Sequence, residues 1–424
     1  MSMQIIIGLV VILATMYCLA KRFESRLVLF LAGLILSCIA MDPMAVFKAF
    51  TKAMTNAKVI EPIIASMGFA FVLKYTKCDE HLVHLLSKGL KNLGPFLVPG
   101  AILITAFINI SITSSSGCSA AVGAILIPLL MRMGVHPAMA ASAVFLGTYG
   151  SPHVNPGYHQ VVIVSEVAKL TPMDVISYFA MPITVSAFVC AAVLTVIAFV
   201  KKEYKGYVME AADDAGNPDF KVNIFKSIVP IVPIVLLLAS NAGMFFGIKL
   251  GISHAMIIGS VLAYLVSYKE TNPQKISKEF FHGAGEGFGH VYGIVTCSLM
   301  FVGGLTAIGM IKELIAAMSA YPEIAKLAGT AGPFFLAMIT GSGDAAAISF
   351  NTAVTVHAAS FGMDPLHLGS AVAAVAGMGR TMSPIAGAAI ICSGYAGVNP
   401  IELTKRNALP VIASAVVFVA LTLL

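Results

Sequence analysis

The sequence predicts an all-α, polytopic membrane protein that is built from two inverted repeats. Three observations lead to this fold class: the composition, an internal match between the two halves of the chain, and the placement of the basic residues. Of the 424 residues, 58% are hydrophobic and only 11% are charged, whereas a soluble domain carries about 25% charged residues. A soluble chain this apolar could not cover its core with polar surface. Soluble, secreted, disordered and nucleic-acid-binding classes are therefore excluded.

Several apolar segments are long enough to span a membrane, which takes about 20 residues. They are residues 4–20, 26–40, 59–75, 177–200, 225–246, 252–268, 291–310 and 405–424. Two further apolar stretches, 94–168 and 332–396, are interrupted by Gly, Ser, Thr, Asn and Pro. Irregular backbone at membrane depth is tolerated only where protein or a water-filled cavity satisfies its polar groups. We therefore expect the functional site in these two stretches.

The chain matches itself at a constant offset of 228 residues. The equivalent pairs are Gly134 and Gly362, Pro137 and Pro365, Ser142 and Ser370, Pro156 and Pro384, Pro172 and Pro400, and Asp174 and Glu402. One polar interlude, residues 201–226, separates the two halves. The sequence therefore predicts a first repeat over 1–200, a cytoplasmic linker over 201–226 and a second repeat over 227–424.

The basic residues predict that the second repeat is inverted. Five spanning helices per repeat, with a re-entrant hairpin after the third span, give an odd number of crossings. With the N-terminus outside, 18 of the 26 Lys and Arg residues lie on the cytoplasmic side, seven lie outside, and Arg380 lies within the membrane. This agrees with the enrichment of basic residues in cytoplasmic loops, although Lys48, Lys52 and Lys58 oppose it. Both termini are expected outside, and residues 44–58 and 275–289 are expected to form interfacial helices.

Each repeat is expected to contain one re-entrant hairpin and one broken helix. The hairpins cover about 94–133 and 332–361, and the broken helices cover about 136–168 and 366–396. Prolines in the breaks remove backbone donors and end helical runs. The N-termini of half-helices suit a carboxylate, and their C-terminal carbonyls suit Na⁺. Inverted repeats with helices broken near the midplane are typical of secondary transporters.

Other classes find little support in the sequence. No HExxH, GxSxG, CxxC or P-loop pattern occurs, so no hydrolase, redox or ATP-driven chemistry is indicated. A potassium-filter sequence is absent as well. We therefore expect a secondary active transporter and not an enzyme. A cation antiporter or channel without an organic substrate stays the alternative from another class.

The polar residues of the two hairpin tips and the two breaks are the candidate substrate-binding residues. They are Ser114, Ser115, Ser116, Gly117, Ser151, Asn155, Ser342, Gly343, Asp344, Arg380, Thr381 and Ser383. Helix N-termini favour anions, and a guanidinium recognises a carboxylate with two parallel hydrogen bonds. A charge inside the membrane needs a partner. Three roles are open for Arg380: a substrate ligand, an ion pair with Asp344, or a gate or cytoplasmic-facing anchor.

A second set of residues is the candidate site of a coupling ion. It consists of Asn109, Thr113, Gly150, Thr340, Asp344 and Gly379. Asp344 could bind a cation, take up a proton or pair with Arg380, while the roles of Glu61, His153 and His159 stay open. We expect no cofactor, and Na⁺ is the one metal ion that this set could hold.

The two broken stretches resemble the anaerobic C4-dicarboxylate carrier family of type C uptake and efflux transporters. The resemblance is carried by Ser114–Gly117, by Thr340–Gly343 and Gly379–Pro384 (Gly-Arg-Thr-Met-Ser-Pro), and by Asn399–Glu402 with Lys405 and Arg406. It implies carriage of succinate, fumarate or malate coupled to H⁺ or Na⁺ by a scaffold and an elevator-type transport domain. A homodimer in a bacterial inner membrane is also implied.

The chain departs from this family's pattern at two places. Asparagine commonly follows Gly-Ser-Gly at the second tip, whereas Asp344 stands here, and His153 and Asn155 replace small or hydroxyl residues in the first break. An additional acid repels a dianion unless it is protonated or paired. An amino-acid carrier, with Asp344 binding an ammonium group, or a short-chain carboxylate carrier therefore stays the alternative within the same fold.

Overall fold

The computed structural model describes residues 3–21, 23–87, 94–208, 220–241, 244, 250–313 and 322–423. Over these residues the chain forms helices and no strands, which confirms the all-α fold class. The predicted linker is described only at its two ends, 201–208 and 220–226. The end of the predicted span 225–246 lies outside the described residues except for Met244.

The first half of the described chain is a series of helices, of which the last, residues 172–200, is the longest. Its helices are α1 (Met3–Ala20), α2 (Ser25–Ile39), α3 (Met44–Met54), α4 (Ala57–Thr76), α5 (Cys78–Ser87), α6 (Leu97–Ser111), α7 (Ser115–Arg132), α8 (Pro137–Leu146), α9 (His159–Ala168) and α10 (Pro172–Val200). A 3₁₀ turn, η3 (Ser151–Val154), lies between α8 and α9.

The second half repeats much of this order. Its helices are α11 (Ile224–Ile228), α12 (Val232–Asn241), α13 (Ile252–Val266), α14 (Pro273–Glu286), α15 (Gly293–Ala307), α17 (Pro322–Thr340), α18 (Gly343–Ala353), α19 (Pro365–Arg380), α20 (Gly387–Ala396) and α21 (Pro400–Leu423). The 3₁₀ segment η6 (Thr355–Phe361) follows α18, and a π-helical stretch, η5 (Gly287–Tyr292), joins α14 to α15.

Residues that match at the offset of 228 have matching structural roles. Four of the prolines begin helices: Pro137 begins α8, Pro365 begins α19, Pro172 begins α10 and Pro400 begins α21. Proline suits this place because its missing N–H would have no partner in the first turn. Gly134 and Gly362 both have a positive φ, +93° and +77°, in the turn before a helix. The sequence match therefore reflects a recurring local structure.

Five helical segments of the described chain are long and apolar enough to cross a membrane. They are Val59–Thr76, Ser115–Arg132, Pro172–Val200, Pro273–Ala307 and Pro400–Leu423. Shorter apolar helices include Ser25–Ile39, Leu97–Ser111 and Ile252–Val266. The segment Pro273–Ala307 is one continuous helical run, so the expected interfacial helix 275–289 continues directly into the expected span 291–310. The equivalent α3 is instead separated from α4 by Thr55 and Asn56.

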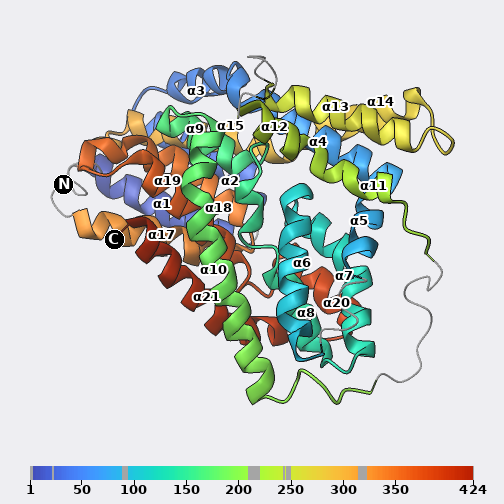
Figure 1. Cartoon of the computed structure of the whole chain (residues 1–424). Helices are drawn as coiled ribbons and strands as arrows, with labels where there is room; N and C mark the ends of the chain where they lie inside the picture. Colours follow the sequence, from blue (N-terminus) through green and yellow to red (C-terminus); the bar gives the residue numbers. More distant parts are fainter. Residues whose placement is uncertain are drawn as a thin grey trace.

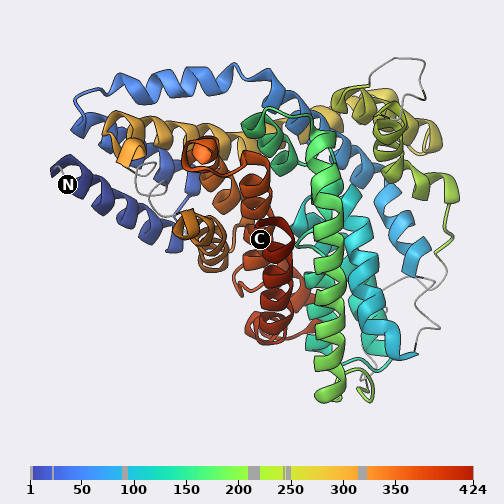
Figure 2. The same cartoon turned by 60° about the vertical axis from the view of Figure 1, so that its left-hand side comes forward.

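The broken helices interleave the two halves of the chain. α8 packs on its own hairpin helices, α6 and α7, but α9 packs on α18 and α19 of the other half. Likewise α19 packs on α17 and α18, whereas α20 packs on α7 and α8. The long helices α10 and α21 lie side by side, with α6, α7, α8 and α20 on one side of the pair and α17 and α19 on the other (Figures 1 and 2). Each break therefore lies where hairpins from both halves meet.

A second group of helices packs beside this interleaved unit. α2 and α3 pack on α15, and α13 and α14 pack on α4, while α3 lies along one face of the molecule in both views. The crossing of α2 with α15 is close because glycine leaves room for it: a Cβ on Gly33 would lie 2.7 Å from the Met300 carbonyl oxygen. Small residues commonly bring membrane helices this close.

Candidate functional site

Both hairpin tips are short turns that a serine ends by capping the next helix. In the first tip, the Ser114 hydroxyl accepts a hydrogen bond from the Gly117 N–H at 3.2 Å and begins α7. In the second tip, the Ser342 hydroxyl accepts from the Ala345 N–H at 3.1 Å and begins α18. Serine is among the preferred capping residues because its oxygen satisfies an N–H left unpaired in the first turn.

The two breaks differ in length and in how their backbone is satisfied. The first runs from the end of α8 at Leu146 to the start of α9 at His159 and encloses η3, which contains Pro152. The second is shorter and runs from Arg380 to Gly387. The carbonyl of Thr381, a fully buried residue, accepts a hydrogen bond from Asn407 Nδ2 of α21 at 3.1 Å. The neighbouring helix thereby replaces a bond that the break removes.

Glycines allow the tips and breaks to touch one another. A Cβ on Gly377 would contact the carbonyl oxygen of Tyr149, which belongs to the first break. A Cβ on Gly341 would lie 3.1 Å from the Ala386 nitrogen in the second break, and one on Gly343 would lie 3.1 Å from the Ala376 carbonyl oxygen. Glycine is required at Gly341 for a second reason, since its φ is +75°. The two breaks and both tips therefore form one compact junction.

Arg380 forms one side of this junction, which we call the arginine pole together with Ser115 and Thr148. Arg380 is 9% exposed, and its Nη2 donates to the Thr148 carbonyl oxygen at 2.8 Å. The Ser115 hydroxyl of the first tip donates to the same oxygen at 3.4 Å. Arg380 Nη1 has no hydrogen-bond partner. The pole thus holds a buried positive charge with donor capacity left over, which is suited to a carboxylate.

Asp344 forms the other side, the aspartate pole, together with Tyr158, His159 and Gln160. Its Oδ1 accepts hydrogen bonds from Gln160 Nε2 at 2.8 Å and from the Tyr158 hydroxyl at 3.4 Å. His159 Nε2 lies 3.0 Å from the same oxygen. The Asp344 side chain nevertheless remains 47% exposed, whereas that of His159 is 12% exposed. The carboxylate is therefore fixed through one oxygen while open space borders the rest of the group.

Arg380 and Asp344 do not form the ion pair that was one of the roles open for Arg380. Both residues lie in the described part of the chain, and each has other partners. Arg380 donates to Thr148, whereas Asp344 contacts Tyr158, His159 and Gln160. The single positive and the single negative charge of the junction are thus held separately.

Several predicted residues serve the framework of the junction. The Asn155 side chain donates to the Ile110 carbonyl oxygen at 2.6 Å and accepts from the Gly157 N–H at 2.8 Å, so both its amide nitrogen and its amide oxygen are engaged. Asn109 donates to the Ile112 carbonyl oxygen at 2.7 Å and accepts from the Ser151 hydroxyl at 3.3 Å. These bonds tie the first break to the end of α6.

The second tip and second break show a similar division. The Thr340 hydroxyl donates to the Leu336 carbonyl oxygen at 2.8 Å, and that of Thr381 to the Met378 carbonyl oxygen at 2.7 Å. Ser383 is fully buried, and its hydroxyl has no partner. Gly379 faces the Phe334 carbonyl, where a Cβ would collide. Ser383 is therefore the residue of this group with hydrogen-bonding capacity left for a ligand.

The remaining predicted residues lie at the first tip and at the start of η3. Ser114, Ser116 and Gly117 are exposed, while Ser116 lies next to Gly387, where a Cβ would be 2.8 Å from the serine hydroxyl. Gly150 precedes η3, and its carbonyl oxygen lies 2.8 Å from His153 Nδ1. The His153 ring is 1% exposed and stacks on Phe179, and its Nε2 has no partner.

A cavity of about 580 Å³ reaches the first tip from the side of α4 and α5. Thr113, Ser114 and Gly117 of the first tip line it together with Lys74 of α4 and with Asp79 and Glu80 of α5. Burial raises the pKa of the Asp79 carboxyl to about 6. The cavity therefore connects the tip hydroxyls to a charged surface between the two groups of helices.

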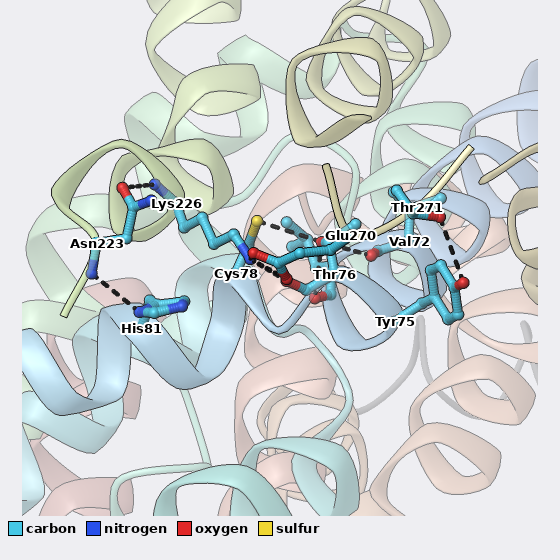
Figure 3. A network of polar contacts seen from close by, with 10 residues as sticks. Val72, Tyr75, Thr76, Cys78, His81, Asn223, Lys226, Glu270 and Thr271 are labelled. Atoms are coloured by element: carbon cyan, nitrogen blue, oxygen red, sulfur yellow. Dashed lines mark hydrogen bonds and ion pairs between the residues drawn. The ribbon is translucent and has the colours of Figure 1, made fainter. Parts of the chain in front are cut away.

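A polar network that includes no residue of either pole lies at the junction of α4 with α5 (Figure 3). Lys226, which is 3% exposed, donates to Glu270 at 2.7 Å and reaches the Thr76 carbonyl oxygen at 3.5 Å. The Asn223 N–H donates to His81 Nδ1 at 3.1 Å. The network fastens the start of the second half to the end of α4, so we assign it a structural role.

Arg406, one of the residues that carry the family resemblance, also has a structural place. It is 5% exposed and donates to both oxygens of Glu203, at 2.5 and 2.8 Å, and to Glu402 at 2.9 Å. These bonds hold the segment after α10 against the start of α21. Glu61 likewise lies apart from the poles, where it accepts a bond from Ser253 of α13 at 2.5 Å.

Sequence reasoning did not name Thr148, Tyr158 and Gln160 as site residues. Thr148 contributes a backbone carbonyl, which has no side-chain signature. Tyr158 and Gln160 flank His159 at the start of a half-helix. Gln160 could have indicated the site, because a polar side chain inside an apolar stretch of a membrane protein is a sign of function. Over the described residues, no group of three or more His, Cys, Asp or Glu side chains is arranged to hold a metal ion.

Comparison with known proteins decides the family. A family model described as C4-dicarboxylate anaerobic carrier matches residues 3–424. The chain belongs to this family. The resemblance seen in the sequence is thereby confirmed, and the protein is a polytopic membrane transporter and not an enzyme.

Relatives of this carrier agree with the assignment. The anaerobic C4-dicarboxylate transporter DcuC of Escherichia coli is 23% identical over 447 residues, which cover 99% of this chain and 96% of the relative. An uncharacterized transporter of Haemophilus influenzae is 36% identical over 281 residues, covering 64% of this chain and 100% of the relative.

Two solved structures share the fold of this carrier. Neisseria gonorrhoeae MtrF, described as illustrating a class of antimetabolite efflux pumps, has a TM-score of 0.64 at 13% identity and covers 89% of this chain and 83% of its own. The YdaH transporter of Alcanivorax borkumensis has a TM-score of 0.63 at 14% identity, with 88% and 87% covered. At this identity the likeness concerns the fold alone.

Proposed function

We propose that the protein is a secondary active transporter of small dicarboxylates, with succinate, fumarate and malate as substrates. The observation that carries this proposal is the arginine pole. Arg380 is buried, it is held by Thr148 through one nitrogen, and its other terminal nitrogen has no partner. Burying a cation whose N–H donors have no partner costs free energy unless an anion binds to it. The names of the full-length relatives support a C4-dicarboxylate as that anion.

The second carboxylate of the substrate is expected at the first tip. Ser115 already shares an acceptor with Arg380, and Ser116 and Ser114 beside it are exposed. The N–H groups at the start of α7 add partial positive charge there. Ser383 supplies a further hydroxyl without a partner. One end of the substrate would therefore meet the guanidinium, and the other would meet hydroxyls and helix N–H groups.

Transport would proceed by alternating access between two inverted repeats, residues 1–200 and 227–424. The hairpins, the broken helices, α10 and α21 would form the moving transport domain, and the group of α2, α3, α4, α13, α14 and α15 would form the scaffold. This proposal is supported by the matched prolines and glycines and by the interleaving of the breaks with hairpins of both halves. The cavity beside the first tip supports access from the side of α4 and α5.

Transport would be driven by a gradient of Na⁺ or H⁺ across a bacterial inner membrane. Asp344, Asn109 and Thr340 are the candidate residues for the coupling ion. We further propose that both termini lie outside and that two copies form a homodimer. The distribution of basic residues supports the orientation, and the family resemblance supports the dimer.

Uptake into liposomes tests the substrate class. The full chain would be reconstituted, and entry of labelled succinate would be followed with unlabelled malate, fumarate, lactate or arginine as competitors. Saturable uptake that malate and fumarate inhibit is the expected result. Uptake that no dicarboxylate inhibits would contradict the proposal.

Asp344 favours one alternative, a carrier of amino acids. Its carboxylate is 47% exposed at the junction and could accept an ammonium group while Arg380 binds a carboxylate. In that case amino acids would inhibit the uptake of a labelled amino acid, and malate and fumarate would not.

A further inference from the structure

The aspartate pole places a histidine on a carboxylate at the substrate junction. His159 Nε2 lies 3.0 Å from Asp344 Oδ1, and Gln160 and Tyr158 donate to the same oxygen. Histidine is the side chain that ordinarily changes its charge between about pH 5 and 8. Asp344 is therefore held in a fixed position beside a group that can become its counter-ion.

The charges of the two poles give this arrangement a consequence for substrate binding. Arg380 carries one positive charge and Asp344 one negative charge, so the junction is neutral while His159 is neutral. A dicarboxylate brings two negative charges, and the Asp344 carboxylate repels them. When His159 is protonated, its positive charge compensates the Asp344 carboxylate. The positive charge of Arg380 is then available to the substrate. Binding of the dianion and binding of a proton thus favour each other.

The other titratable side chains near α9 are engaged elsewhere or are buried. α9 packs on α4, α10, α18, α19, η3 and η6. On η3, α19 and η6, the titratable groups with described side chains are His153 on Gly150 and Phe179, Arg380 on Thr148, His367 stacked on Tyr178, and the half-buried His357. On α10 they are Asp174 on Thr171, Tyr178, and the fully buried Cys190. On α4 they are Glu61 on Ser253, Lys74 at the cavity beside the first tip, and Tyr75, which accepts from Thr271; Glu166 of α9 itself accepts from Asn56. Of the described charged groups, Asp344 is the one in contact with the His159 ring.

We propose that His159 and Asp344 form the proton-binding site of this carrier, which takes up one proton for each dicarboxylate bound at Arg380. The Nε2 that faces Asp344 Oδ1 carries the ring hydrogen of the neutral imidazole. The proton enters from the compartment that supplies the substrate and adds to the other ring nitrogen of His159. The imidazolium then pairs with the Asp344 carboxylate, and both proton and substrate leave on the opposite side. The proposal rests on the proposed function, and it names H⁺ rather than Na⁺ as the coupling ion.

The test uses the full chain in liposomes and buffers that contain K⁺ and no Na⁺. Counterflow of labelled succinate at equal pH measures substrate exchange, and uptake under an inward pH gradient measures coupling. For the unaltered protein, the KM for succinate should fall about tenfold from pH 8 to pH 6. An inward proton gradient should accelerate uptake severalfold.

Two variants separate the proton site from the substrate site. In His159→Gln, the KM should change less than about twofold over the same pH range, and the gradient should no longer accelerate uptake. In Asp344→Asn, the repulsion is removed, so the KM at pH 8 should fall toward the value that the unaltered protein shows at pH 6. His367→Gln is the matched control, because His367 stacks on Tyr178 at the other end of α19, and it should keep the full pH dependence.

The outcomes distinguish this inference from the proposed function. If His159→Gln retains the pH dependence of KM and the response to the proton gradient, the proton site is overturned. A further arm replaces external K⁺ by Na⁺, and uptake that responds to the Na⁺ gradient and not to the proton gradient would overturn it as well. Absence of saturable succinate counterflow in the unaltered protein at every pH would overturn the proposed function itself.

A second measurement does not depend on the folding of any variant. The purified unaltered protein in weakly buffered detergent solution would be saturated with succinate at about pH 7–8, where succinate is a dianion. A pH-indicator dye should report net proton uptake approaching one proton per chain toward the lower end of that range. No uptake, or release of protons, would overturn the inference.

Discussion

The arginine pole and the aspartate pole lie at the same junction, yet they are built from different kinds of groups. The arginine pole has a fixed positive charge that is 9% exposed and is held by a backbone carbonyl. The aspartate pole has a carboxylate that is 47% exposed and is held by side chains, one of which can change its protonation state. Both charges come from the second half of the chain, and residues of the first half hold each of them. One junction between the two halves can therefore keep a fixed positive charge and an adjustable negative charge apart.

The largest expected effect comes from removing the charge of the arginine pole. Arg380→Gln retains an amide donor for the Thr148 carbonyl but loses the cation. We expect a loss of about 3 kcal/mol in substrate binding, which is roughly a hundredfold rise in the KM for succinate. Arg132→Gln, at the exposed end of α7, is the control and should transport normally. Equal KM values for the two variants would place the anion elsewhere.

A second variant tests the contact that brings the two breaks together. In Gly377→Ala, the new methyl group would collide with the Tyr149 carbonyl oxygen, so we expect a destabilisation of roughly 1–3 kcal/mol and slower transport. Gly394→Ala is the matched control in α20, because no atom lies within 4 Å of its added Cβ; it should stabilise the helix by about 0.5–1 kcal/mol. Thermal unfolding in detergent, followed with a thiol-reactive dye, measures both.

Ser115→Ala should have a smaller effect on the arginine pole. The Ser115 hydroxyl forms a long hydrogen bond of 3.4 Å with the Thr148 carbonyl oxygen, and a neutral hydrogen bond contributes about 0.5–1.5 kcal/mol. We expect the KM for succinate to rise by roughly two- to tenfold, with no change in its pH dependence. A loss of pH dependence in this variant would show that the two poles are not separate.

The smallest effect on transport is expected from Asp79, which supplies a test of where pH dependence arises. Burial raises the pKa of this carboxyl from 3.8 to about 6, so the folded state holds the proton more tightly than the unfolded state does. The contribution of Asp79 to the free energy of unfolding is fully present below pH 4. It is lost as the pH rises through 6, by up to about 3 kcal/mol. Asp79→Asn should therefore raise the melting temperature at pH 7.5 but not at pH 4. It should leave the pH dependence of succinate KM in place; its loss would assign that dependence to Asp79 rather than to His159.

Much of the framework could be predicted from the sequence because its signals are local. Proline and glycine act through backbone sterics, so Pro137, Pro365, Gly134 and Gly362 mark the starts and turns of α8 and α19 wherever the helices pack. The run Thr340–Asp344 indicated a tip for the same reason. The continuity of α14 with α15 departs from the expected separate interfacial helix over 275–289, because the π-helical stretch Gly287–Tyr292 continues the helical backbone through that boundary.

The contacts between side chains within the site were harder to predict from the sequence. Arg380 and Asp344 could be recognised as charges that need partners, but the sequence does not tell which partners lie nearest in space. The answer depends on α9 crossing from the first half to pack on α18 and α19, a long-range contact with no local signature. Asn155, expected to bind substrate, instead bonds the Ile110 carbonyl oxygen and the Gly157 N–H, because irregular backbone consumes nearby amides.

A structure of the full chain in lipid nanodiscs with succinate bound tests the central claim most directly. The account predicts one carboxylate of succinate within hydrogen-bond distance of Arg380 Nη1, with the second at the hydroxyls of the first tip and His159 still on Asp344. Succinate bound in the cavity beside Lys74, with Arg380 contacting only Thr148, would contradict it.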